Sequence, residues 1–117
     1  MTRGTTSYKN STLSYLIEGE GDTIVLLHGF LESALMWKYI TPALSKNHQV
    51  IAIDLLGHGE TGCLSNSHSM DDMADAVHSI LIDLSIENAT LIGHSMGGYV
   101  ALAFAQHYTE MVQEIIL

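Results

Sequence analysis

Four continuous apolar segments recur along this 117-residue chain, and segments with helical character separate them. The apolar segments span residues 23–28, 50–54, 89–93 and 112–117. Apolar runs of this length, without alternating polar positions, are typical of strands that are buried on both faces. Strands that alternate with helices form a parallel sheet that helices cover on both sides. The sequence therefore predicts an α/β fold, a three-layer sandwich with a mostly parallel sheet.

The remaining elements follow from spacing and turn residues. Apolar positions at helical spacing predict helices over 33–45, 69–84 and 96–107, and Pro42 is expected to kink the first or to start a new turn. Ser69 is the expected N-cap of the second helix, with Asp71 and Asp72 in its first turn. Residues 5–8 and 13–18 are typical of two short strands joined by a hairpin turn, which we expect to pair antiparallel at one edge of the sheet. A chain of this length suits one domain, residues 1–117.

Composition excludes several classes of partner. The chain has 13 acidic and 4 basic residues, a formal net charge of −9, which argues against binding to nucleic acid or to anionic lipid. Cys63 is the only cysteine, so no internal disulfide can form. No apolar run approaches the roughly 18 residues of a membrane span, and the N-terminus lacks the apolar stretch of a secretory signal. We expect a cytoplasmic protein that acts on a small-molecule substrate.

The segment Gly93-His94-Ser95-Met96-Gly97 joins a predicted strand to a predicted helix with almost no residues to spare. The chain must reverse within one or two residues, so we expect a strained backbone at Ser95 and a hydroxyl raised above the end of the sheet. Gly93 and Gly97 have no side chains to collide where strand and helix meet. This is the pattern of a nucleophile elbow, and it makes Ser95 the candidate nucleophile. The helix N-terminus there favours a developing negative charge.

A second motif supplies the donors that such a nucleophile needs. Attack on an ester or amide produces an oxyanion, which backbone N–H groups can stabilise. One candidate donor is the N–H of Met96, directly after Ser95. The other is the N–H of Phe30, in the loop that follows the strand ending in His28-Gly29.

Taken together, HGF at 28–30, Trp37, DLLGHGET at 54–61 and GHSMGG at 93–98 resemble the α/β-hydrolase superfamily, above all its single-domain esterase, C–C hydrolase and MenH-like branch. The resemblance covers the whole chain. It implies an α/β-hydrolase fold that stops after the start of its sixth strand, a serine hydrolase acting on a small carbonyl compound, most simply an ester, and no cofactor. Related dehalogenases and many epoxide hydrolases carry Asp at the elbow, so Ser95 counts against those activities. Asp54 would anchor the turn that follows it.

A glycine pattern at 57–62, GHGETG, matches a dinucleotide fingerprint, but that fingerprint must open directly into a helix. The polar residues that follow it predict a loop over 57–67 instead, so NAD and FAD are not expected.

The partners of Ser95 are expected outside this chain. In the resembling family the acid and then the histidine follow the serine, beyond residue 117. Within the chain, His107 would lie about 18 Å from Ser95 along one helix, which is too far for a general base. The side chain of His94 should point away from the elbow, and a base at His28 would approach Ser95 from the wrong side. His58, His68 and His78 match no metal-ligand pattern.

We therefore expect the N-terminal half of a serine hydrolase, inactive alone, whose apolar edge at 112–117 would promote self-association. Three origins remain open: a piece of a longer gene product, a shortened version of one, or a short protein that pairs with another chain. Two other functions also remain open, a MenH-like lyase or synthase on the same scaffold, and a non-catalytic binding protein.

Overall fold

A computed structural model describes residues 2–62 and 68–117 and shows one six-stranded sheet in the order β1-β2-β4-β3-β5-β6. β1 and β2 pair antiparallel, β2 pairs antiparallel with β4, and β4, β3, β5 and β6 run parallel. The predicted mostly parallel sheet, with an antiparallel hairpin at one edge, is confirmed. The strands are β1 (Thr2–Tyr8), β2 (Ser11–Glu18), β3 (Asp22–Leu27), β4 (His48–Asp54), β5 (Ala89–Gly93) and β6 (Val112–Ile116).

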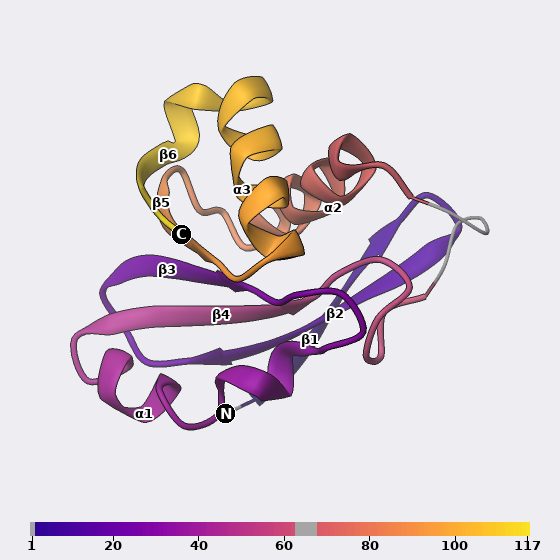
Figure 1. Ribbon diagram of the computed structural model, residues 1–117. Coiled ribbons are helices and arrows are strands. Elements are labelled where there is room, and N and C mark those ends of the chain that lie inside the picture. Colours follow the sequence, from indigo (N-terminus) through magenta and orange to yellow (C-terminus); the bar gives the residue numbers. More distant parts are fainter. Residues whose placement is uncertain (1, 63–67) are drawn as a thin grey trace.

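Helices cover both faces of this sheet, which makes three layers (Figure 1). α2 (Met70–Asp83) and α3 (Met96–His107) lie on one face, while η1 (Ala34–Trp37) and α1 (Thr41–Leu44) lie on the other. A short η2 (Thr109–Met111) leads into β6. The central strands bury side chains in both directions: Val25 and Leu27 point into the α2–α3 core, and Ile24 and Leu26 into the η1 core. This two-sided burial explains why these strands read as unbroken apolar runs.

The predicted helix over 33–45 is wrong as a single helix. The structure has the 3₁₀ helix η1 and then α1, a single turn with Pro42 at its start. Proline cannot donate the N–H that a continuous helix needs, and its ring clashes with the carbonyl one turn back. Thr41 closes the junction, since its hydroxyl donates to the carbonyl of Trp37 at 2.8 Å. Pro42 therefore begins a new turn, one of the two outcomes expected for it.

The helix over 69–84 begins as expected. Ser69 is its N-cap and forms a capping box with Asp72, each side chain accepting the other's backbone N–H. The predicted loop over 57–67 is described only to residue 62, and there it forms tight turns rather than a helix start. Cys63 lies outside the described residues. Within the described ranges, no helix is both long and apolar enough to cross a membrane.

Candidate active site

The strained backbone expected at Ser95 is present. Its φ of 55° and ψ of −116° lie where a residue with a side chain is rarely found. Such a conformation costs on the order of 1–3 kcal/mol and persists only where surrounding contacts enforce it. His94 and Ser95 are the two residues that connect β5 to α3, and Ser95 is exposed. The residue therefore sits at the carboxyl end of the parallel strands, facing solvent.

Two glycines make this tight junction possible. A Cβ added to Gly97 would stand 2.1 Å from the carbonyl oxygen of Leu27, and one added to Gly93 would stand 2.5 Å from the carbonyl oxygen of Gly97. No side chain fits at either position. The N–H of His94 also donates to the Leu27 carbonyl at 3.0 Å, so the end of β3 holds the junction from below.

The loop after β3 forms a tight turn that presents Phe30. The N–H of Glu32 donates to the carbonyl of Gly29 at 3.2 Å, and Leu31, inside the turn, has a φ of 62°. His28, which is fully buried, donates from Nδ1 to the same Gly29 carbonyl at 2.7 Å. A peptide group is planar and trans, so its C=O and N–H point in opposite directions. Fixing the Gly29 carbonyl therefore fixes the direction of the Phe30 N–H.

The direction of the Met96 N–H is fixed in the same way. The carbonyl of Ser95 accepts the N–H of Gly98 at 2.9 Å, along the axis of α3. Met96 shares a peptide group with that carbonyl, so its N–H points out of the helix N-terminus. As the first residue of α3, Met96 has no intrahelical partner for this N–H. Both N–H groups singled out from the sequence thus belong to peptide groups held by neighbouring hydrogen bonds.

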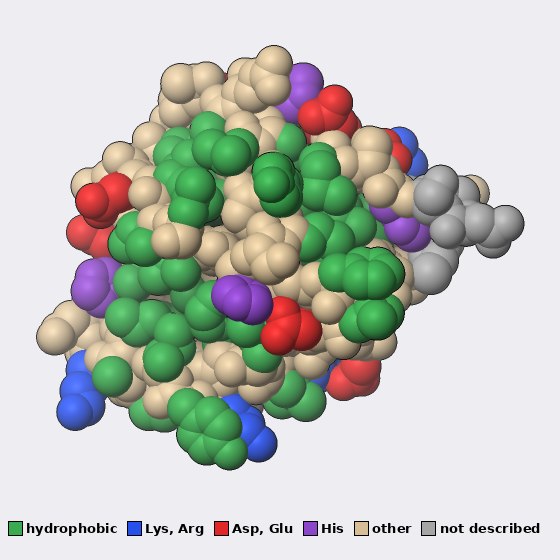
Figure 2. Space-filling model, in the orientation of Figure 1, with side chains coloured by type: hydrophobic (Ala, Val, Ile, Leu, Met, Phe, Trp, Pro, Cys, Tyr) green, Lys and Arg blue, Asp and Glu red, His purple; other side chains and the backbone are tan. Residues whose placement is uncertain are grey.

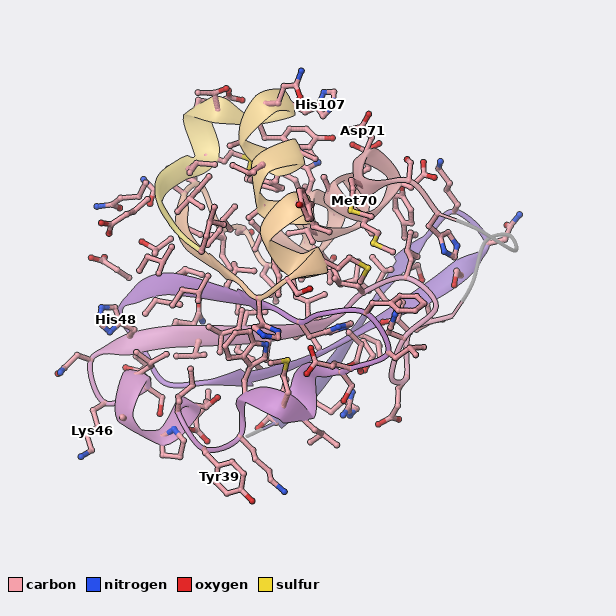
Figure 3. The ribbon with its side chains drawn as sticks, in the orientation of Figure 1. Tyr39, Lys46, His48, Met70, Asp71 and His107 are labelled. Carbon is pink, nitrogen blue, oxygen red and sulfur yellow. The ribbon has the colours of Figure 1, made fainter. Side chains whose placement is uncertain are left out.

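Three histidines considered as partners of Ser95, His28, His94 and His107, have other hydrogen-bond partners. His28 accepts the N–H of Leu55 at Nε2, at 3.0 Å, so the neutral ring uses both nitrogens. Burial is the main cause that lowers the pKa of His28 and keeps it neutral. His107 lies at the far end of α3, where its Nε2 is 3.0 Å from Asp71 on α2 (Figure 3). His94 points to Glu32, with 3.2 Å between Nδ1 and the carboxylate.

Asp54, at the end of β4, organises the surroundings of the site. Its buried carboxylate accepts the N–H of Ala34 at 2.8 Å and the N–H of Glu60 at 3.1 Å, and it pairs with Arg3 at 3.1 Å. These bonds tie together η1, the turn at 57–62 and β1. The anchoring role expected for Asp54 from the family resemblance agrees with these contacts.

An apolar surface adjoins Ser95. A groove of about 310 Å³ is lined by Gly93, Ser95, Gly98, Tyr99, Leu102 and Leu117. Figure 2 shows hydrophobic side chains gathered over this face of the molecule, around α3 and the sheet below it. None of the side chains in this lining carries a charge.

Sequence reasoning did not single out Glu32. The available signal was its position three residues after Gly29, where a carboxylate can reach back to an N–H at the start of a turn.

Comparison with known proteins now decides the family. A family model of the α/β hydrolase fold matches residues 22–117. The chain belongs to the α/β hydrolase family. Among solved α/β hydrolase structures, the epoxide hydrolase CorEH superposes with a TM-score of 0.94 at 31% identity, over 97% of this chain and 40% of that one. A thermophilic esterase from Thermogutta terrifontis superposes with a TM-score of 0.90 at 32% identity, over 98% of this chain and 44% of the esterase.

A curated relative is named for a different activity. A candidate 2-succinyl-6-hydroxy-2,4-cyclohexadiene-1-carboxylate synthase of Bacillus subtilis (strain 168) is 34% identical over 113 residues, 88% of this chain and 39% of the relative. The chain spans less than half the length of each of these three proteins. The α/β hydrolase fold is therefore shared with hydrolases and with a candidate synthase.

Proposed function

We propose that Ser95 is the nucleophile of a serine hydrolase that cleaves small esters, with a histidine and an acid supplied from outside residues 1–117. The Ser95 oxygen attacks the ester carbonyl carbon, and its proton passes to that histidine. The carbonyl electrons move onto oxygen, and the N–H groups of Phe30 and Met96 stabilise the resulting oxyanion. Collapse expels the alcohol, which takes the proton, and water then hydrolyses the acyl-serine by the same route.

One observation carries this proposal: an exposed serine held at φ 55° and ψ −116° between a parallel strand and a helix N-terminus. A structural turn at this point would be more stable with glycine, which adopts a positive φ without strain. A serine retained there at an energetic cost is typical of a functional site.

The esterase reading is favoured over epoxide hydrolysis. The chain is similar to both an epoxide hydrolase and an esterase at nearly equal identity, so overall likeness does not separate the two. The residue at the elbow favours ester hydrolysis, because many epoxide hydrolases of this superfamily carry Asp where this chain has Ser95. The apolar groove beside Ser95 suits an uncharged acyl group.

The test is labelling with a fluorophosphonate probe, together with p-nitrophenyl ester hydrolysis, on the protein expressed from its complete coding sequence. The wild type should label and turn over, and Ser95→Ala should do neither while keeping its unfolding midpoint. Ser85→Ala is the matched control. Ser85 is another exposed serine with positive φ, 59°, but it lies between α2 and β5, at the amino end of β5 and so at the opposite end of that strand from Ser95. Label that survives in Ser95→Ala would refute the proposal.

A lyase reaction on the same scaffold is the second candidate, favoured by the 34% identity to the candidate synthase of Bacillus subtilis. Product analysis separates the two candidates. An esterase releases an acid and an alcohol with uptake of water, whereas an eliminating enzyme releases two fragments without uptake of ¹⁸O from labelled water.

A further inference from the structure

We infer that Glu32 is a positioning residue that couples the loop at residues 28–32, which carries the Phe30 N–H, to the junction at His94 and Ser95; this inference rests on the proposed function of Ser95. One carboxylate oxygen of Glu32 serves both segments. It accepts the N–H of Gly29 at 3.0 Å and lies 3.2 Å from Nδ1 of His94, the residue that precedes Ser95. No other side-chain hydrogen bond found among the described residues joins these two segments.

On the loop side, Glu32 closes the turn twice. Its carboxylate holds the N–H of Gly29, and its own N–H holds the carbonyl of Gly29. The peptide groups before and after Gly29 are both fixed by one residue, and the second of them carries the Phe30 N–H. The turn also contains Leu31 at a φ of 62°, a conformation that costs energy for a residue with a side chain. Without the carboxylate, this strained turn would lose a bond that holds it closed.

On the serine side, Glu32 holds the side chain of a residue whose backbone is already fixed. The N–H of His94 donates to Leu27, and its carbonyl accepts the N–H of Gly97. The Glu32–His94 contact therefore joins the loop that carries Phe30 to a residue beside the nucleophile whose backbone is fixed. A displacement of about 1 Å in a positioned catalytic group costs on the order of 100-fold in rate.

The contact is accessible to mutation without loss of the fold. The side chains of Glu32 and His94 are 37% and 56% exposed, and neither belongs to the buried core. A pair this exposed adds little to global stability. Its effect should therefore appear in the rate of reaction rather than in the unfolding midpoint.

The experiment measures kcat and KM for ester hydrolysis by the protein from its complete coding sequence, for wild type, Glu32→Ala, Glu32→Gln and His94→Ala. The oxyanion exists only after attack, so Glu32→Ala should lower kcat about 10- to 100-fold with KM within about two-fold. Glu32→Gln keeps an acceptor for the Gly29 N–H and should recover most of the rate. The kcat of the double variant Glu32→Ala/His94→Ala should lie within about three-fold of that of Glu32→Ala. Both substitutions remove the same Glu32–His94 contact, so their effects should not add.

Glu60→Ala is the matched control, since it removes an exposed carboxylate from another loop, one that pairs with Arg3. It should keep the wild-type kcat. If Glu32→Ala has the same kcat as the wild type, or if Glu32→Gln is as slow as Glu32→Ala, the positioning role of Glu32 is wrong. Either result leaves the assignment of Ser95 unchanged. If the wild type neither labels nor hydrolyses esters, the proposed function itself fails. A double variant whose loss equals the product of the single losses would show that Glu32 does not act through His94.

Discussion

A Cβ built on Gly97 would stand 2.1 Å from the carbonyl oxygen of Leu27, so the first turn of α3 rests directly on the end of β3. We predict that Gly97→Ala destabilises the protein by about 3 kcal/mol, because the added methyl group would overlap backbone atoms of Leu27 and His28. Gly98→Ala is the control. Its Cβ would meet the end of the Leu117 side chain at 3.3 Å, and its distance of 3.8 Å from the carbonyl oxygen of Gly93 is an ordinary contact. It should be neutral or stabilising by up to about 1 kcal/mol, the usual helix gain of Ala over Gly. Urea unfolding of both variants checks this, and equal losses would contradict it.

Asp54 should be the most costly carboxylate to remove. Asp54→Ala leaves the N–H groups of Ala34 and Glu60 without their acceptor and Arg3 without its buried carboxylate partner. The expected loss is about 3–5 kcal/mol, a large share of the stability of a small domain. Glu60→Ala removes the other, exposed partner of Arg3 and should cost less than about 1 kcal/mol. Chemical denaturation of the two variants should therefore give clearly separate midpoints, and coinciding midpoints would show that Asp54 is not the anchor.

Stability should fall as the pH drops below about 6.5 because of His28. Burial lowers the pKa of His28 below the ordinary histidine value of about 6.5, so the unfolded chain binds a proton that the folded chain resists. Where the unfolded state binds more protons, stability rises with pH. A proton on Nε2 would also break the bond from the Leu55 N–H. His28→Asn should have lower stability at pH 8 but a flatter decline from pH 7 to 5. Urea titrations at several pH values measure this, and an unchanged slope would assign the decline to other groups.

Most of the fold could be predicted from the sequence, because the strands that matter are buried on both faces. The segments at 23–28, 50–54 and 89–93 have no competing interpretation as amphipathic elements, and each became a central strand within one or two residues of its predicted ends. The helix capped by Ser69 was equally clear, since cap, acidic first turn and apolar spacing agreed. The prediction of a single helix over 33–45 was wrong, because the apolar spacing is typical of one helix while Pro42 requires a break.

The site was predictable where backbone geometry follows from residue type. Ser95 between glycines could be placed from the sequence, since only a sharp reversal connects the strand to the helix there. The bond from the Gly29 N–H to Glu32 had a local signal, but the contact with His94 could not be predicted, because it depends on how two loops from distant parts of the chain meet. His94 lies 62 positions away from Glu32, and nothing in the local sequence of either residue indicates the contact.

One edge of β6 is not covered by any strand of the described residues. β6 is an outer strand of the described sheet, and Ile116 and Leu117 are 47% and 72% exposed there. An uncovered strand edge with apolar side chains favours pairing with a second copy. We propose that the 117-residue chain alone self-associates through this edge. Ile116→Lys should shift sedimentation velocity profiles toward monomer, since a charge on an edge opposes pairing. Ile82→Lys is the matched control, because Ile82 is an exposed isoleucine on α2 and its replacement should leave the association unchanged. A monomeric wild-type chain at high concentration, or an equal shift in both variants, would exclude β6 as the contact.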